Sequence, residues 1–542
     1  MTSNKIATND SSCELQTNAT RVALDVFLAI IIPTIFRLLW INTFNLCEDE
    51  AYYWEWSRRL ALSYHDAGPG IALAIRTGTS LFGNTVFGIR FMAVILFSCA
   101  LGFIYKLVCY LYDRRTALWT VLFLNIIPLF ALGGLLMIYD TVQAFFWCAA
   151  LYCFARAVRL GEKHVVSVEG NSKPGPIYWW ALTGLCVGLG FDGKYTAVLF
   201  IPAAIAYLLV HKRERRWFTL PHPYFMGFIA LLAVSPVLYW NFQHDWRSVV
   251  QILSLGKKAK YFIQPQYFFE LLGGQLGIIS PILFAFMGWR LIDAWKKGVL
   301  GQDRRKLFML IFCLLYSGPF FLLACKKRVF ANWPGIGYVT GIILVATWYV
   351  SVKDSWEFKI SSLRKWFLGG VWLAIAFTVI LYLHLATCML PFRPKKDPLT
   401  PRFVGWPEMV QHAEQLRGKH QTDGHKVYFY AATHQLAALV AFYASGQPMD
   451  VREVKCEGRP NQYDLWGDLR PGEDAILLVP GKNSAPDIVY KTFDKVDEEK
   501  PLSINLRGKT AKLIRFYYCR NYHPVSSCQK SAIGRLKHNG KV

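Results

Sequence analysis

Long apolar stretches separated by short polar segments fill the first 390 residues of the chain. Most have close to the roughly 20 residues that an α-helix needs to cross the hydrocarbon core of a bilayer. The pattern therefore predicts a polytopic α-helical membrane protein with about eleven transmembrane helices. The predicted spans are residues 23–46, 84–111, 116–138, 141–160, 177–193, 195–211, 223–241, 267–293, 307–325, 333–352 and 366–390.

The polar linkers predict an orientation. If the N-terminal tail, residues 1–22, lies in the cytoplasm, the basic linkers all fall on the cytoplasmic side, as the positive-inside rule requires. These linkers are 111–115, 155–164, 211–217, 295–306 and 353–365. We therefore expect a multi-pass inner (plasma) membrane protein, with a transmembrane domain over 23–390 and a first outer loop at 47–83.

The pattern changes after about residue 390. Amphipathic stretches alternate with strand-like ones between Gly, Pro and Asn residues, which predicts a small α/β domain over 391–542. An odd number of spans places this domain on the periplasmic, extracytoplasmic side. Among the 13 cysteines, Cys456, Cys519 and Cys528 lie in this part, where one pair can oxidise.

Composition supports the membrane assignment. Hydrophobic residues make up 54% of the chain and charged residues 18%, while the formal net charge is +24. Such a charge also occurs in nucleic-acid-binding proteins, but here the cations gather in short linkers between apolar runs. Membrane orientation explains them, and we expect no nucleic-acid partner.

Acidic residues stand directly after the first apolar run, in 48-EDE-50. Carboxylates at a membrane interface are costly to desolvate, and they are often functional. Asp49 and Glu50 are therefore candidate catalytic residues. Equally, they can mark the N-terminus of an interfacial helix over 51–62, where acids complement the helix dipole.

Further charged residues fall on the same predicted outer side. Asp140, in 137-MIYDT-141, is either a functional acid or the N-cap of the next helix. Lys194 breaks an apolar hairpin and either binds a ligand or extends to the interface. In 326-KKRVFAN-332, Lys326, Lys327 and Arg328 run against the charge bias, and they can hold a phosphate or belong to a solvated loop.

A metal site has weaker support. His244 and Asp245, in 241-NFQHDW-246, are potential ligands, but two ligands are few and a turn is the simpler interpretation. The sequence indicates no certain cofactor and leaves a divalent metal ion open. Taken together, acids and cations on one membrane face are typical of group transfer from a phosphate leaving group to a hydroxyl or amine.

Several motifs also occur together in one known group. The chain resembles bacterial integral-membrane glycosyltransferases of the GT-C fold, the protein mannosyltransferase and lipid A aminoarabinose transferase group (families 39 and 83). The motifs are 49-DEAYYWEWSRRLALSY-64, Asp140 and Thr141 in 137–141, 193-GKYT-196, 240-WNFQHDW-246, 270-ELLGGQLG-277, 331-ANWP-334 and, in the C-terminal domain, 461-NQYDLW-466.

This resemblance implies an inverting glycosyltransferase with a polyprenyl phosphate sugar as donor. It implies Asp49 as catalytic base, with Glu50 adjacent. The physical interpretation adds Lys194 and the 326–328 cations as contacts of the departing phosphate, and it gives Asp140 the positioning of the acceptor, the sugar or a metal ion. His244 and Asn332, which lie within the motifs, are candidate substrate contacts. All these groups are expected to meet at the outer lip of the bilayer.

One departure from the family pattern adds two candidates. Many relatives carry a Pro-Pro pair, often after Lys, near the end of the first outer loop, whereas this chain reads 65-HDAGPG-70. Arg58 and Arg59 are therefore alternative phosphate contacts. No extra sugar-binding-like domain of the eukaryotic protein mannosyltransferases is recognisable, which favours a glycolipid acceptor such as lipid A over a protein.

Three alternatives remain at this stage: a protein O-mannosyltransferase, a transporter or flippase of lipid-linked substrates, and a scaffold without catalysis. A transporter is expected to show related halves and charges at mid-membrane depth. The charges here stand at the predicted helix ends on one side, which favours an enzyme.

Overall fold

The structure is a computed structural model that describes residues 20–162, 176–251, 263–394, 397, 399–422, 426–455, 459–481 and 483–524. Two compact units divide the chain. The first comprises Met1–Ile41, Ala67–Gly83 and Arg90–Leu381, and the second comprises Asn42–Asp66, Asn84–Ile89 and Tyr382–Val542. Residues 1–19 of the predicted tail, Cys456 and Cys528 lie outside the described residues, whereas Cys519 is a free, buried thiol.

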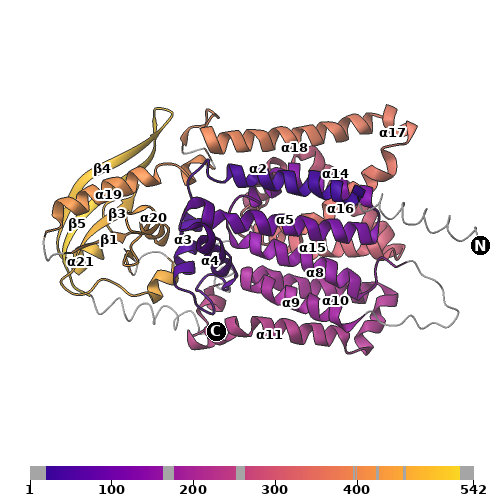
Figure 1. Ribbon diagram of the computed structural model, residues 1–542, viewed down its shortest axis with the longest axis horizontal. Coiled ribbons are helices and arrows are strands. Elements are labelled where there is room, and N and C mark those ends of the chain that lie inside the picture. Colours follow the sequence, from indigo (N-terminus) through magenta and orange to yellow (C-terminus); the bar gives the residue numbers. More distant parts are fainter. Residues whose placement is uncertain are drawn as a thin grey trace, which may run out of the picture. The chain divides into compact units, whose positions relative to one another are not determined.

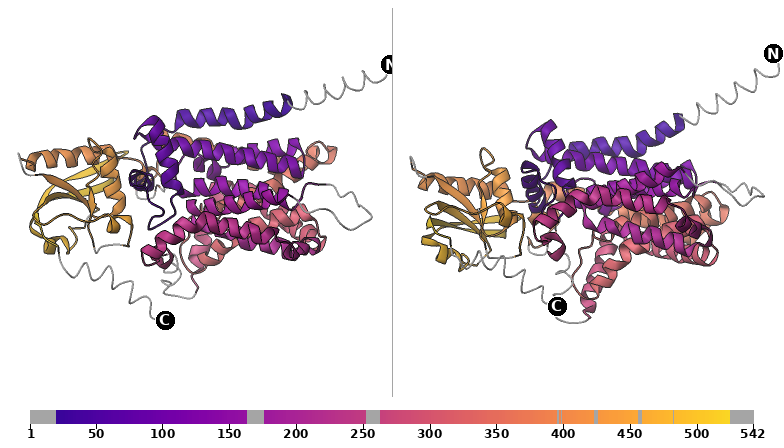
Figure 2. Two further views of the ribbon diagram at one scale, coloured as in Figure 1. Left: turned by 60° about the horizontal axis from the view of Figure 1, so that its bottom comes forward. Right: turned by 90° about the horizontal axis from the view of Figure 1, so that it is seen from below.

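The first unit is helical, and its long helices lie alongside one another (Figures 1 and 2). Its elements are η1 (Phe27–Ile31), α2 (Ile32–Trp40), α4 (Gly70–Phe82), α5 (Val86–Leu111), α6 (Arg114–Ile126), α7 (Pro128–Gly133), α8 (Tyr139–Ala157), α9 (Ile177–Gly193), η2 (Tyr195–Leu199), α10 (Phe200–Val210), η3 (Lys212–Thr219), α11 (His222–Gln243), α13 (Pro265–Ile279), α14 (Pro281–Ala294), η4 (Trp295–Leu300), α15 (Arg304–Ala324), η5 (Gly335–Gly337), α16 (Tyr338–Val352), α17 (Trp356–Ile360) and α18 (Ser362–Thr387).

Among the described residues, six helices are long and apolar enough to cross a membrane, or up to eight if two bent pairs each count as one span. The six are Thr20–Trp40, Val86–Leu111, His222–Gln243, Arg304–Ala324, Gly335–Val352 and Ser362–Thr387. The chain is therefore a multi-pass membrane protein with a mainly helical fold. The predicted number of about eleven spans is not established by these lengths and stays a prediction.

One bent pair shows how sequence interrupts an apolar run. The predicted span 267–293 divides into α13 and α14, which meet at an angle of 106°. Pro281 opens α14, and the residue before it, Ser280, has φ +100°. Proline has no N–H to donate and disfavours helical geometry in the preceding residue, so the helix breaks here.

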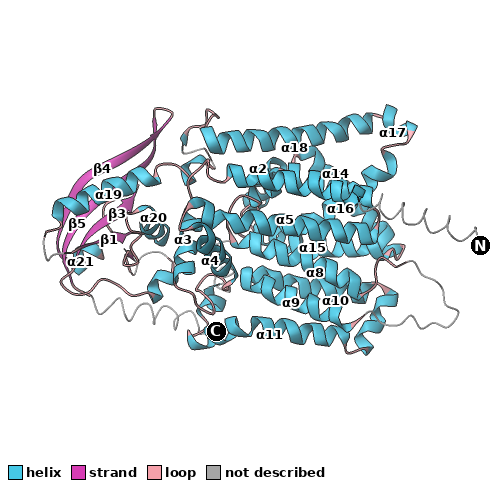
Figure 3. Ribbon diagram, viewed as in Figure 1, coloured by secondary structure: helices cyan, strands magenta, loops and turns pink. Residues whose placement is uncertain are grey.

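The second unit contains all the strands found in the described part of the chain (Figure 3). Its elements are α3 (Glu48–Arg58), η7 (Thr400–Arg402), α19 (Trp406–His420), β1 (Val427–Ala431), α20 (His434–Tyr443), β2 (Arg452–Glu453), η8 (Gln462–Leu465), β3 (Asp474–Pro480), α21 (Val489–Thr492), β4 (Phe493–Leu506) and β5 (Lys509–Tyr522).

The five strands form one sheet in the order β2-β1-β3-β5-β4. Strand β1 runs parallel to both β2 and β3, with Ala431 opposite Leu478, while β5 is antiparallel to β3 and β4. Strand β3 is buried from Asp474 to Val479, so both faces of the sheet are covered there. Helix α20 carries the chain from β1 to β2, whereas β3 lies on the other side of β1.

The strand-like stretches 426–432, 475–480 and 512–518 coincide with β1, β3 and β5, and the amphipathic stretches 406–418 and 434–444 with α19 and α20. Strand β4 was not predicted. Its sequence, FDKVDEEKPLSINL, is rich in charge because most of the strand is exposed or half-buried. A strand of this kind lacks the alternation that sequence analysis depends on.

Candidate active site

Helix α3 presents the acidic motif. Cys47 is its N-cap, and Glu50 Oε2 accepts a hydrogen bond from the Cys47 backbone N–H at 3.1 Å. Glu50 is fully buried, and together with Glu48 and Asp49 it occupies the first helical turn, where carboxylates complement the helix dipole. The helix begins at Glu48, three residues before the predicted start, and the structure shows Glu50 as a capping residue.

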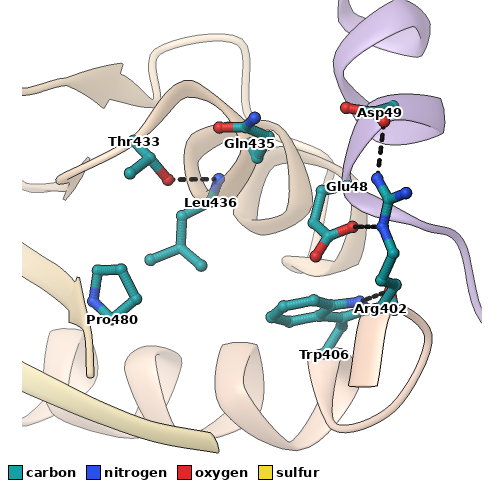
Figure 4. Close-up of a pocket in the computed structure, with 8 residues that line it drawn as sticks. All are labelled: Glu48, Asp49, Arg402, Trp406, Thr433, Gln435, Leu436 and Pro480. Carbon is teal, nitrogen blue, oxygen red and sulfur yellow. Dashed lines mark hydrogen bonds and ion pairs between the residues drawn. The ribbon is translucent and has the colours of Figure 1, made fainter. Parts of the chain in front are cut away.

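Asp49 makes an ion pair that sequence analysis did not anticipate. Arg402 Nη2 donates to Asp49 Oδ2 at 2.8 Å, and Arg402 Nε donates to Glu48 Oε2 at 3.2 Å (Figure 4). The other oxygen of Asp49, Oδ1, accepts no hydrogen bond from the described residues, and the Asp49 side chain is 36% exposed. One oxygen is thus held in place while the second stays available for another donor.

The segment that carries Arg402 is itself fixed. Trp406 Nε1 donates to the Arg402 carbonyl at 2.9 Å, and Lys512 Nζ donates to the Val404 carbonyl, also at 2.9 Å. Gly405, between them, has φ +88°, and a Cβ there would lie 2.5 Å from Ile504. Only glycine fits this position without strain, so the turn sets the direction from which Arg402 approaches helix α3.

The charges around Asp49 influence one another. Burial raises the pKa of Glu48, and the neighbouring Arg402 offsets only part of that rise. Burial alone would lower the pKa of Arg402, but the carboxylate of Asp49, with Cys47 and Glu48, raises it above its usual value. Burial also lowers the pKa of Lys512 to about 7. Arg402 therefore stays charged at neutral pH.

A pocket of about 250 Å³ opens beside this ion pair. Its walls come from α3, from the η7–α19 segment, from the start of α20 and from the end of β3 (Figure 4). The lining residues are Glu48, Asp49, Arg402, Trp406, Thr433, Gln435, Leu436 and Pro480. All of them belong to the second unit.

Arg58 and Arg59, predicted as substrate contacts, are engaged within the second unit. Arg58 donates to Glu55 at 2.7 Å and to the Gln447 carbonyl at 2.6 Å, and Arg59 binds Glu55 and the Met449 carbonyl. The Arg59 guanidinium also lies over the Trp466 ring, 4.3 Å from its centroid. In the structure these two arginines hold α3; a role in binding substrate is not tested and stays a prediction.

The 461-NQYDLW-466 motif holds the same segment from another direction. The backbone N–H of Gln462 donates to the Tyr52 hydroxyl at 2.8 Å, and the Gln462 side-chain oxygen accepts from the His65 N–H at 2.8 Å. Asn461 and Asp464 form a reciprocal cap around η8. The motif therefore fastens both ends of the 52–65 stretch that follows Asp49.

The first unit brings two predicted residues together. Lys194 Nζ lies 2.6 Å from Asp140 Oδ1, and the lysine also lies over the Tyr139 and Trp333 rings. Asp140 stands in the first turn of α8, and Ile138, not Asp140, is the N-cap, so the N-cap interpretation of Asp140 is wrong. Gly193 allows the end of α9 to approach α8 closely, since a Cβ at this position would lie 2.9 Å from Val142 Cγ1.

The cationic loop follows helix α15 in the first unit. Arg328 Nε lies 3.1 Å from Glu270 Oε2, and the Arg328 side chain is 75% exposed. Lys327 is partly buried, and the Asn332 carbonyl accepts the Gly335 N–H at 3.0 Å, which closes the turn after the loop. Asp49 belongs to the second unit and these cations to the first, so their meeting stays a prediction.

The residues near His244 form a turn. His244 ends α11, stacks on Trp240 with ring centroids 4.0 Å apart, and bonds the Trp240 carbonyl through Nδ1 at 2.8 Å. Asp245 follows with φ +53°. Within the described ranges, no group of three or more His, Cys, Asp or Glu residues is placed to hold a metal ion.

Comparison with solved structures identifies the fold. The chain matches ArnT from Cupriavidus metallidurans bound to undecaprenyl phosphate with a TM-score of 0.57, over 91% of this chain and 97% of that one, at 14% identity. The profile of the family described as dolichyl-phosphate-mannose-protein mannosyltransferase matches residues 66–240, which include Asp140 and Lys194. The chain shares the fold of ArnT, and the comparisons support the predicted resemblance to the protein mannosyltransferase and aminoarabinose transferase group of GT-C glycosyltransferases.

Two curated relatives are named as sugar transferases. The lipid A galacturonosyltransferase RgtD of Rhizobium johnstonii is 27% identical over 403 residues, which are 72% of this chain and 77% of the relative. The undecaprenyl phosphate-α-4-amino-4-deoxy-L-arabinose arabinosyl transferase of Serratia proteamaculans is 23% identical over 331 residues, 56% of this chain and 55% of the relative. The predicted enzyme class, a glycosyltransferase, is confirmed.

Arg402 and Gln435 were missed by sequence analysis. Arg402 stands 353 positions after Asp49, in a segment between the last apolar run and an amphipathic helix. A lone arginine in such a segment normally indicates a solvated surface. No signal in a single sequence pairs it with Asp49.

Proposed function

We propose that this glycosyltransferase transfers a sugar, with inversion at the anomeric carbon, from a polyprenyl phosphate to lipid A or a similar glycolipid on the periplasmic face of the inner membrane. Support comes from the two curated relatives, both named for sugar transfer, one of them to lipid A. The structural relative binds undecaprenyl phosphate. The proposal includes about eleven spans and an extracytoplasmic C-terminal α/β domain.

The observation that carries the proposal is the Asp49 carboxylate, held through Oδ2 by Arg402 and unbonded at Oδ1 beside a pocket. In the proposed step, Oδ1 takes the proton of an acceptor hydroxyl as the hydroxyl oxygen bonds to C1 of the donor sugar. The bond between C1 and the phosphate oxygen breaks, and its electron pair leaves with the lipid phosphate. Base catalysis of this kind contributes typically about 10²–10⁴-fold to the rate.

The leaving phosphate gains charge during this step. We assign its stabilisation to Lys194 and to the loop cations Lys326, Lys327 and Arg328. Asp140, at 2.6 Å from Lys194, is then the residue that orients the lysine. The proposed step draws only on side chains of the chain itself.

A protein acceptor is the second candidate, favoured by the description of the matching family profile. Mass analysis of cell-envelope lipids and proteins, with and without the functional gene, distinguishes the two. We expect lipid A, or another glycolipid, to lose the mass of one sugar when the protein is absent. A mass change confined to proteins would replace the proposal by the second candidate, and no change in either would refute sugar transfer.

The cationic loop provides a prediction about the donor. Lys326→Ala and Arg328→Ala are expected to raise the KM for the polyprenyl phosphate sugar about tenfold, because each removes a charge-assisted contact to phosphate. The KM for the acceptor is expected to change little. Initial rates at varied donor and acceptor concentrations measure both constants.

Glu270→Gln is the matched control, since Glu270 is the ion-pair partner of Arg328. The glutamine removes the pair and keeps the cation, so donor KM is expected to stay near that of the native protein. Equal losses for donor and acceptor, or the same loss in Glu270→Gln, would mean that the loop acts through its structure.

A further inference from the structure

The pocket beside Asp49 lies at a particular point of the C-terminal sheet. Strands β1 and β3 are parallel neighbours, and the chain leaves β1 through α20 toward β2, away from β3. The strand order therefore reverses between β1 and β3. In open α/β sheets, ligands bind in the crevice at the carboxyl ends of strands at such a point. Thr433 and Gln435 follow the end of β1, and Pro480 ends β3.

The lining groups suit a neutral polyhydroxyl ligand. The carboxylates of Glu48 and Asp49 accept hydrogen bonds, the Arg402 guanidinium donates them, and the Gln435 amide does both. Gln435 is half-buried, and no hydrogen bond joins its side chain to the described part of the chain. Arg402 partly neutralises the carboxylates of Glu48 and Asp49. The pocket therefore does not need a strongly charged ligand to balance its own charge.

The size of the pocket narrows the range of ligands that can fit it. At about 250 Å³ it lies below the range of about 300–1,000 Å³ typical of pockets for drug-sized ligands. It therefore suits a single small ring. Leu436 and the end of β3 at Pro480 provide apolar surface, which matches the C–H faces of a pyranose ring, while the polar groups match its hydroxyls.

We propose that this pocket binds the pyranose ring of the acceptor, the ring whose hydroxyl is deprotonated by Asp49, so that the C-terminal domain selects the acceptor. The inference rests on the proposed function for the role of Asp49. The acceptor ring is favoured over the donor sugar because the carboxylate that lines the pocket is the one that takes the acceptor's proton in the proposed step. Gln435 is then a specificity residue on the α20 side.

The kinetic test uses Gln435→Ala in the full-length protein, with purified lipid A as acceptor and the polyprenyl phosphate sugar at saturation. Alanine is a good helix former, so α20 is expected to stay intact. The KM for lipid A is expected to rise about tenfold through loss of hydrogen bonds to hydroxyls, with kcat and donor KM within about twofold of the native values. Gln411→Ala, an exposed glutamine on α19 outside the pocket, is the matched control.

A binding test separates this inference from the proposed function. Saturation-transfer NMR with the neutral methyl N-acetylglucosaminide as probe, and with no donor present, reports ring binding even if no transfer is detected. We expect a signal with the native protein and with Gln411→Ala, and none with Gln435→Trp, in which the indole fills the pocket. Unchanged lipid A KM in Gln435→Ala, an equal rise in donor KM, or an undiminished probe signal in Gln435→Trp would overturn the inference.

Discussion

Asp49→Asn is expected to reduce sugar transfer about 1,000-fold, because asparagine cannot take a proton from the acceptor hydroxyl. The amide is almost the same size as the carboxylate, and the side chain is 36% exposed. The lost ion pair with Arg402 is partly exposed to solvent, so the cost to folding is expected to stay below about 1 kcal/mol. Single-turnover transfer from a polyprenyl phosphate sugar to lipid A measures the loss.

Two control variants on the second unit test whether the loss of activity is specific to Asp49. Glu408→Gln removes an exposed carboxylate of α19 that does not line the pocket, and it is expected to keep native activity. Glu48→Gln removes the other carboxylate that Arg402 binds, and it is expected to lose far less activity than Asp49→Asn. If Glu48→Gln were inactive and Asp49→Asn active, the base would be Glu48.

Arg402→Ala is expected to lower kcat about 100-fold, because misplacement of a catalytic group by about 1 Å can cost that much. Arg402 holds Oδ2 of Asp49 and thereby directs Oδ1, so its loss frees the carboxylate to rotate. The KM for the donor is expected to change less than about threefold. Arg402→Lys keeps one donor and the charge, and it is expected to restore about a tenth of the native kcat.

A double variant tests whether Arg402 acts on kcat through Asp49. If Arg402 acts through Asp49, the double variant Asp49→Asn with Arg402→Ala is expected to be no less active than Asp49→Asn alone. Arg515→Ala, which removes the pair between Arg515 and Glu498 on β5 and β4, is the matched control and is expected to keep native activity. Additive losses would show that Arg402 acts independently of Asp49.

The helical, membrane-spanning character could be predicted because it depends on local composition. In the hydrocarbon core no water is available to hydrogen-bond the backbone, so apolar runs of sufficient length form helices there. The helices Arg304–Ala324 and Ser362–Thr387 follow their predicted runs closely. The break at Ser280 and Pro281 and the exposed strand β4 were missed. In both, the outcome depends on neighbouring elements or on one backbone angle more than on hydrophobic periodicity.

The candidate site also contains residues that could be recognised from the sequence and partners that could not. Asp49, Glu50, Asp140 and Lys194 were recognisable because charge beside apolar runs is costly and because they fall within family motifs. Their partners were not. The pairing of Asp140 with Lys194, the capping role of Glu50 and the role of 461-NQYDLW-466 in holding the 52–65 stretch all depend on which chain segments pack together.

The sequence by itself determined that this protein crosses a membrane several times and carries acids and cations where apolar runs end, since hydrophobicity and charge act at each position locally. Only the tertiary structure decided that Arg402, 353 residues away, holds Asp49, and that a pocket opens between β1 and β3 beside it. Long-range pairing depends on how the sheet orders its strands and on the turn at Gly405. Neither leaves a local pattern in the chain.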